Sequence, residues 1–147
     1  MPLTIRPATE NDQPAIRSLI AAVRLPRMNL QWPNFVVAEE DGGMVGMGQV
    51  KSHGDGSREL ASIAVLPKRQ GQHIGTAVIK GLLAREAGVV LHLSCRRELE
   101  GYYERFGFRR IEPAAYPPYF RRTTGLVNRI TPLFGIHLIA MRREAAG

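Results

Sequence analysis

A chain of 147 residues, 44% hydrophobic and 22% charged, has the length and composition of one globular domain with a core of its own. It has a single cysteine, Cys95, no apolar leader and no run of roughly 18 apolar residues, so we expect a cytoplasmic protein without a disulfide or a membrane span. The net charge of +7 suits a polyanionic ligand, but the dispersed arginines lack an RNA-binding aromatic motif or a helix-turn-helix pattern. We therefore expect no nucleic-acid partner and keep one only as a minority hypothesis.

The first part of the chain is predicted to contain a short strand, a helix and three further strands. The strand covers 3–6, and an amphipathic helix follows a capping-box-like pair, Thr9 and Asp12, with Pro14 in its first turn. The apolar residues with helical spacing are Ile16, Leu19, Ile20 and Val23. After an irregular stretch over 24–34, strands are predicted over 35–39, 44–51 and 59–66, separated by the turn signals Asp41-Gly42-Gly43 and Gly54-Asp55-Gly56.

The rest of the chain alternates helices and strands. The predicted elements are a helix over 74–86, a strand over 89–95, a helix over 98–106 capped by Gly107, and strands over 108–111 and 137–142. This order predicts an α/β or α+β protein with a mixed sheet, in one domain over 1–147.

An extra segment over 113–135 precedes the last strand. It contains apolar residues at near-helical spacing, namely Leu126, Val127, Ile130, Leu133 and Phe134. They predict an additional packed helix. A lid over a substrate site, begun by Tyr119 and Phe120, is the alternative, because long connections in compact domains are often functional.

The turn before the helix at 74 could hold a phosphate. An apolar run ends at Pro67, and a short basic and polar turn leads into the helix. The first N–H groups of a helix lack intrahelical partners and carry the positive end of its dipole, and small residues let a phosphate approach them. Neither a P-loop nor a GxGxxG pattern is present. The sequence therefore predicts a pyrophosphate site formed by Gln70, Gly71, Gln72, His73, Ile74, Gly75 and Thr76.

Two motifs resemble those of the GNAT acetyltransferase superfamily. Gln70 to Gly75, which follows Val65-Leu66-Pro67, is similar to the family's acyl-CoA signature Q/R-x-x-G-x-G/A, with His73 in place of the first glycine. That substitution permits binding if the His73 backbone keeps φ < 0. Residues 99–110, LEGYYERFGFRR, are similar to the family's later signature of a tyrosine four residues before Gly-Phe. The resemblance covers most of residues 3–112.

The resemblance implies a GNAT-like acyl-CoA N-acyltransferase fold, with a mixed central sheet of about seven strands and flanking helices. Its fourth and fifth strands splay apart to admit the pantetheine arm. It also implies acetyl-CoA as co-substrate, with edge backbone groups of Ile63, Ala64 and Val65 pairing with pantetheine and polarising the thioester carbonyl.

Tyr103 and Glu59 are the predicted catalytic residues. Tyr103 stands where the family has its general-acid tyrosine, although Leu99, Tyr102, Tyr103 and Phe106 also have the spacing of core residues. Glu59 opens the strand before the turn, where several family members have a carboxylate that acts through water; a solvated strand end is an equally good interpretation.

Other residues leave alternatives open. His92 could replace the carboxylate that the family often has on the fifth strand, or be structural. Arg96 and Arg97 could meet the CoA phosphates or simply be solvated. Cys95 lacks the partners of a nucleophile, and the four histidines, at 53, 73, 92 and 137, lack metal-ligand spacing, so we expect no metal.

The sequence thus favours an N-acetyltransferase that acts on a primary amine of a small molecule or protein, as a monomer or homodimer. The alternative is a non-catalytic acyl-CoA-binding sensor or regulatory module. Tyr119 and Phe120 are the candidate acceptor-binding residues.

Overall fold

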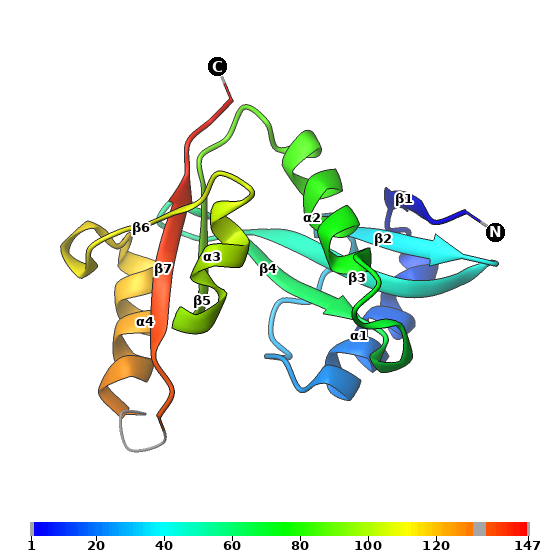
Figure 1. The fold of residues 1–147 in the computed structure, drawn as a ribbon, viewed down its shortest axis with the longest axis horizontal. Helices are drawn as coiled ribbons and strands as arrows, with labels where there is room; N and C mark the ends of the chain where they lie inside the picture. The colour runs from blue at the N-terminus through cyan, green and yellow to red at the C-terminus, as the bar shows by residue number, and fades with distance from the viewer. Residues whose placement is uncertain (1, 131–134, 147) are drawn as a thin grey trace. The chain divides into compact units, whose positions relative to one another are not determined.

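A computed structural model describes residues 2–130 and 135–146 of the chain (Figure 1). The strands are β1 (Thr4–Pro7), β2 (Phe35–Glu40), β3 (Gly43–Ser52), β4 (Arg58–Val65), β5 (Leu91–Arg96), β6 (Arg109–Arg110) and β7 (Leu138–Arg143). The α-helices are α1 (Gln13–Val23), α2 (Ile74–Arg85), α3 (Glu100–Glu104) and α4 (Pro118–Ile130). Among these described residues the strands form a seven-stranded sheet in the order β1-β2-β3-β4-β5-β7-β6. The β4–β5 pair is parallel and the β5–β7 pair is antiparallel, so the predicted mixed α/β fold is confirmed.

The chain forms two compact units. The described parts of 1–51 and 60–86 make the first unit, and those of 52–59 and 87–147 make the second. Strand β4 begins in the second unit and continues in the first, and it pairs with β5 through Glu59 and His92. The predicted splay of the fourth and fifth strands, and the single domain, stay predictions.

The first unit has a core between α1 and its strands. As predicted, Ile16, Leu19 and Ile20 of α1 are buried, and they pack in one cluster with residues of β2, β3 and β4. The hairpin signal is also confirmed, because Asp41 and Gly42 both have positive φ, as a tight turn between β2 and β3 requires.

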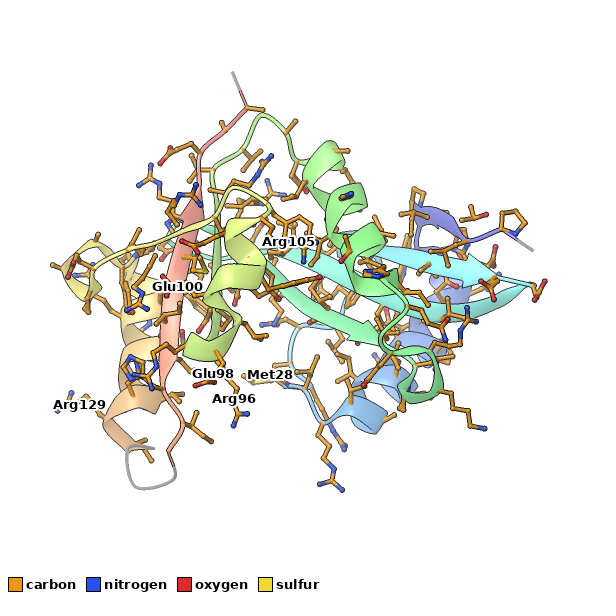
Figure 2. The ribbon with its side chains drawn as sticks, viewed as in Figure 1. Met28, Arg96, Glu98, Glu100, Arg105 and Arg129 are labelled. Carbon is orange, nitrogen blue, oxygen red and sulfur yellow. The ribbon has the colours of Figure 1, made fainter. Side chains whose placement is uncertain are left out.

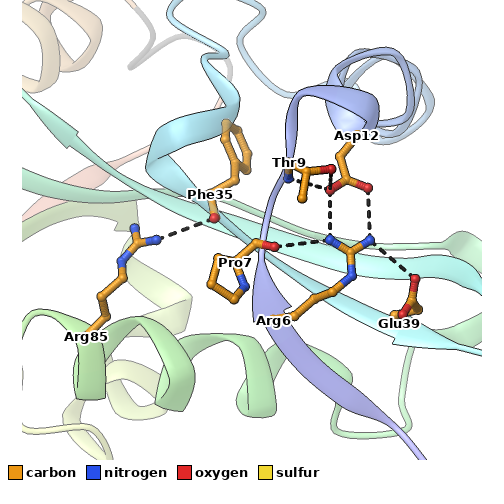
Figure 3. Close-up of polar contacts among 7 residues, drawn as sticks. All are labelled: Arg6, Pro7, Thr9, Asp12, Phe35, Glu39 and Arg85. Carbon is orange, nitrogen blue, oxygen red and sulfur yellow. Dashed lines mark hydrogen bonds and ion pairs between the residues drawn. The ribbon is translucent and has the colours of Figure 1, made fainter.

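Arg6 connects three elements of the first unit (Figure 3). Its guanidinium donates to both carboxylate oxygens of Asp12, at 2.8 and 3.0 Å, and to Glu39 Oε1 at 3.3 Å. The capping box of Thr9 and Asp12 is present, but it caps a 3-10 turn over Glu10–Asp12, which delays the start of α1 to Gln13. On the other side of β1, Arg85 at the end of α2 donates to the Phe35 carbonyl at 3.4 Å. The hydrogen bonds from Arg6 lower the pKa of Asp12 to about 2.

This pKa predicts a loss of stability in acid. Because the folded-state pKa of Asp12 lies below its ordinary value of 3.8, the stabilisation is complete above pH 4 and disappears as the pH falls towards 2. We expect Asp12→Asn to lower the free energy of unfolding at pH 6 by on the order of 1–2 kcal/mol and to weaken its dependence on pH between 4 and 2. Urea unfolding at several pH values measures both. Glu10→Gln, in the same turn, should match the wild type; equal acid sensitivity of Asp12→Asn and the wild type would contradict the prediction.

The second unit packs α4 along β7 (Figure 1). The predicted extra helix is confirmed, but its predicted packing face is wrong. Leu126 and Ile130 are 52% and 60% exposed, whereas Phe120 and Thr124 are buried. Since α4 begins at Pro118 and places Phe120 against the sheet, the residue one turn later faces inward too, and the Thr124 hydroxyl is 2.9 Å from Ser94 Oγ. Leu133 and Phe134 lie outside the described residues.

One further helix is shorter than predicted. Residues Arg97–Leu99 form a 3-10 turn, so that α3 covers only Glu100–Glu104 of the predicted helix over 98–106. Gly107 has φ of +94°, which confirms it as the residue that ends this helical stretch. Within the described ranges, no helix is long and apolar enough to cross a membrane.

Candidate functional site

The turn before α2 contains two residues with left-handed backbone, Gly71 at φ +81° and His73 at φ +64°. The condition stated for His73, a backbone with φ < 0, is therefore not met. His73 is the N-cap of α2, and the chain needs a left-handed residue there to turn from the 3-10 turn at Pro67–Arg69 into the helix. His73 thus has the backbone of a glycine, and its side chain makes no capping hydrogen bond. The His73 side chain therefore does not cap the start of α2.

Gly75, in the first turn of α2, has no internal reason to be a glycine. Its φ is not positive, and an added Cβ would lie 3.7 Å from Val65 Cγ2 and 3.9 Å from Ile63 Cγ2, which are ordinary contact distances. By contrast, a Cβ on Gly46 would lie only 2.7 Å from Ile74 Cγ2. The absence of a side chain at Gly75 therefore leaves room for something outside the chain to approach the helix start.

The end of β4, which carries the predicted pantetheine-pairing residues 63–65, is irregular. Ser62 has φ of +58°, the kind of backbone that occurs where a strand bulges. Gln49, fully buried on β3, donates to Ser62 Oγ at 2.8 Å and to the Asn29 carbonyl at 3.2 Å. Gln70 donates to the Val65 carbonyl over a long 3.4 Å. Gln49 thus supports the irregular strand from behind, within the first unit.

Glu59 lies in a compact polar cluster of the second unit. Its Oε1 is 2.8 Å from Nε2 of His53, and the two side chains are only 12% and 7% exposed. Glu59 is also paired with His92 across β4 and β5. The alternative of a solvated strand end is therefore wrong. Sequence analysis missed His53, although its position across the turn at 54–56 from Glu59 was a signal that the two could meet.

Tyr119 of α4 completes this cluster. Its ring stacks on His53, with centroids 3.5 Å apart and planes inclined by 13°, and its N–H donates to Asp55 Oδ2 at 2.9 Å. Asp55 also accepts hydrogen bonds from Ser57, which are the main reason that its pKa is lowered to about 2. Burial and the Glu59 charge raise the pKa of Tyr119. Glu59 and Tyr119, which are 60 positions apart in the sequence, thus lie around one imidazole.

Phe120 and His92 lie behind this cluster. Phe120 is completely buried and contacts His53 edge-on, with ring centroids 6.4 Å apart, and His92 at 5.5 Å. A fully buried ring does not face a ligand, so Phe120 does not fit the acceptor-binding role predicted for it. His92 is 7% exposed, and its Nδ1 has no hydrogen-bond partner among the residues described. Burial and the Arg142 charge lower its pKa, which keeps the imidazole neutral at pH 7.

Tyr103 is half-buried on α3, with its ring edge-on to Tyr102 and Phe108. Burial, and secondarily Cys95, raises the pKa of Tyr103 to about 12, so the phenol is protonated at neutral pH. The two interpretations of Tyr103 are compatible, because a packed ring can still carry a proton for transfer.

Cys95, Arg96 and Arg97 show few features of catalytic or binding residues. Burial raises the pKa of Cys95 to about 11, so it is a neutral thiol and a poor nucleophile at pH 7. Arg96 and Arg97 are exposed, and Figure 2 shows Arg96 and Glu98 beside the start of α3. Three or more potential metal ligands come together nowhere in the described part of the chain.

The described strands form a mixed sheet, and the turn after β4 leads into the start of α2. A model of the acetyltransferase (GNAT) domain matches residues 31–110, and the chain therefore belongs to the GNAT acetyltransferase family. The match includes Glu59, the turn at 70–76 and Tyr103, and it ends before Tyr119. A search of curated proteins found no match.

Solved structures share the fold. The N-acetylglutamate synthase of Neisseria gonorrhoeae, complexed with coenzyme A and N-acetyl-glutamate, is 22% identical with a TM-score of 0.74 over 97% of this chain. This chain spans only 35% of that synthase. The Rv2747 protein of Mycobacterium tuberculosis, in complex with CoA, is 23% identical with a TM-score of 0.72, over 96% of this chain and 98% of its own. The ribosomal-protein-S18-alanine N-acetyltransferase of Escherichia coli is 18% identical with a TM-score of 0.64, over 99% of this chain and 96% of its own.

Proposed function

We propose that this chain transfers an acetyl group from acetyl-CoA to a primary amine of a small molecule or protein. The amine attacks the thioester directly, in a ternary complex. The observation that carries the proposal is the uncrowded start of α2, where Gly75 is required by neither backbone nor packing. Membership of the GNAT acetyltransferase family and the CoA complexes of two structural relatives support it.

In this proposal the backbone of 70–76 holds the pyrophosphate of acetyl-CoA. In general the first N–H groups of an α-helix are not used by the helix's own hydrogen-bond ladder, and the helix dipole favours an anion at that end. Ile63, Ala64 and Val65 supply edge backbone groups for pantetheine, so the ligand would displace the long hydrogen bond from Gln70 to Val65. The net charge of +7 attracts the polyanionic co-substrate.

Glu59 is the proposed base. A lysine-like amine must lose a proton before it attacks, which costs about 4.6 kcal/mol at pH 7. That amount is small against a typical enzymatic barrier reduction, so a carboxylate acting through a water molecule suffices. Glu59 accepts the amine proton while the nitrogen forms a bond to the carbonyl carbon. No metal takes part in this proposal.

Tyr103 is the proposed acid. When the carbon–sulfur bond breaks, the electron pair stays on sulfur, and Tyr103 gives its proton to the departing thiolate. The phenol has this proton available at neutral pH, since its pKa of about 12 lies far above 7. The proton balance closes when Tyr103 is reprotonated from solvent.

A non-catalytic acyl-CoA sensor is the second candidate. The raised pKa of Tyr103 favours it, since a phenol with a pKa of about 12 is a weaker acid than an ordinary tyrosine. Both candidates bind acetyl-CoA, and only the enzyme releases free thiol in proportion to an acetylated product.

An amine panel separates the two functions. The full chain is incubated with acetyl-CoA and, in turn, with polyamines, amino acids, and peptides that carry a free N-terminus or a lysine. Thiol release is followed colorimetrically and the product by mass spectrometry. We expect one class of amine to give equal amounts of thiol and acetylated product. Calorimetric binding of acetyl-CoA without turnover of any amine would instead support the sensor.

Tyr119 is the proposed wall of the acceptor site, because its half-buried ring lies beside the His53–Glu59 pair. We expect Tyr119→Ala to raise the acceptor KM about tenfold or more, while the KM for acetyl-CoA stays within about twofold. Steady-state kinetics with each substrate varied measures both constants. Leu126→Ala, on the exposed side of the same helix, should change neither. A Tyr119→Ala variant that only melts earlier, with unaltered kinetics, would make this residue structural.

A further inference from the structure

The His53–Glu59 pair is built into the turn between β3 and β4. The His53 N–H donates to the Ser57 carbonyl at 2.9 Å, which closes the turn, and the two side chains then meet at 2.8 Å. Both are nearly excluded from solvent. A hydrogen bond to a carboxylate is stronger under these conditions than one on the surface, because little water competes for either partner.

The contact leaves one carboxylate oxygen of Glu59 for chemistry. His53 engages Oε1, whereas Oε2 has no hydrogen-bond partner within residues 2–130 and 135–146. Because the hydrogen bond from His53 holds Oε1, rotation of the carboxylate group is restricted. Oε2 therefore points in one direction. A base works best when its accepting atom is fixed before the substrate binds.

Helix α4 fixes the imidazole in turn. The Tyr119 ring covers one face of His53, and Phe120 meets it edge-on. The first turn of α4 is itself held by the Asp55 carboxylate, which accepts the Tyr119 N–H. The titratable groups around this assembly are Asp55 of the turn, Glu59 of β4, Tyr119 of α4 and His92 of β5. The extra helix therefore orients His53.

We propose that His53 is a positioning residue, which donates its Nε2 proton to Glu59 and thereby aims the second carboxylate oxygen at the acceptor amine. The inference rests on the proposed function, in which Glu59 is the base. It assigns a role to α4 as well. Through Tyr119, α4 holds the imidazole in the orientation that this hydrogen bond requires.

Two substitutions of His53 separate the hydrogen bond from the stacking. His53→Gln keeps an N–H donor at the same number of bonds from the backbone and loses the ring, whereas His53→Phe keeps a ring for Tyr119 and loses the donor. We expect His53→Phe to lower the acceptor kcat about 10- to 100-fold with the KM for acetyl-CoA unchanged, and His53→Gln to stay within about threefold of the wild type. The proposal would be overturned if both variants lost kcat to the same extent, or if both kept the kcat of the wild type.

Nuclear magnetic resonance tests the pair without any turnover. In the wild type we expect a slowly exchanging Nε2–H resonance from His53, assigned by its absence in His53→Phe, and we expect its loss in Glu59→Ala. A resonance that Glu59→Ala leaves unchanged would overturn the proposal. If the wild type acetylates no amine, the proposed function fails; if it acetylates one and His53→Phe matches it, only the positioning role fails.

Discussion

Gly75→Glu is expected to abolish CoA binding while the chain stays folded. The proposed pyrophosphate site depends on N–H groups at the start of α2 and on the absence of a side chain in front of them. A glutamate at Gly75 adds both bulk and a negative charge at the place where two phosphates would lie. Anions bind at the start of a helix because the helix dipole is positive there. A fixed carboxylate at position 75 therefore removes both the attraction for the phosphates and the space that they need.

The matched control is Gly75→Ala. Its Cβ would meet Val65 and Ile63 only at ordinary distances, so this variant should melt within a few degrees of the wild type. Titration calorimetry with CoA should give no detectable heat of binding for Gly75→Glu and a measurable, weaker affinity for Gly75→Ala. Wild-type affinity in the glutamate variant would show that the pyrophosphate binds elsewhere, and thermal melting of each variant shows whether a loss is due to unfolding.

Much of the fold was predictable because local rules determine it. The apolar spacing of α1 needs only the helical period, and Asp41-Gly42 is a turn wherever two strands flank it. The packing face of α4 was not predictable in this way. Its sequence offers two apolar sets, and only the packing of the folded chain decides that Phe120 faces inward, against Ala140 of β7, and Leu126 outward.

The backbone conformation of His73 could not be predicted from the sequence, for a different reason. A histidine at φ +64° is uncommon, because a side chain disfavours the left-handed region. His73 nevertheless has a left-handed backbone as the N-cap of α2, a conformation that glycine adopts more readily. His73 leads directly into the packed helix α2, whose buried residues include Ile74 and Val78.

Individual residues of the candidate site were predictable from the sequence, but their arrangement around His53 was not. Motif resemblance pointed to Glu59, and the aromatic start of the extra segment pointed to Tyr119, yet only the fold brings them to one imidazole. His53 had no motif of its own. Its role follows from register, since a tight turn places residues on its two sides opposite each other.

Tyr103→Phe is expected to lower kcat about 100-fold, a typical contribution of a general acid. The substitution removes one hydroxyl and keeps the ring that packs on Tyr102 and Phe108, so the melting temperature and the affinity for acetyl-CoA should change little. Because the pKa of Tyr103 is about 12, its proton is present throughout pH 7–10, and the wild type should show no alkaline decline from this group in that range.

The matched control is Tyr102→Phe, the neighbouring phenol on the same helix, which should retain turnover within a fewfold of the wild type. Both variants are compared by kcat at saturating acceptor, since the chemical step alone depends on the acid. A thioester with a better leaving group than CoA should restore much of the loss in Tyr103→Phe, because a less basic thiolate needs less help from a proton. An unchanged kcat, or a loss that the leaving group does not relieve, would leave Tyr103 as a residue of the core.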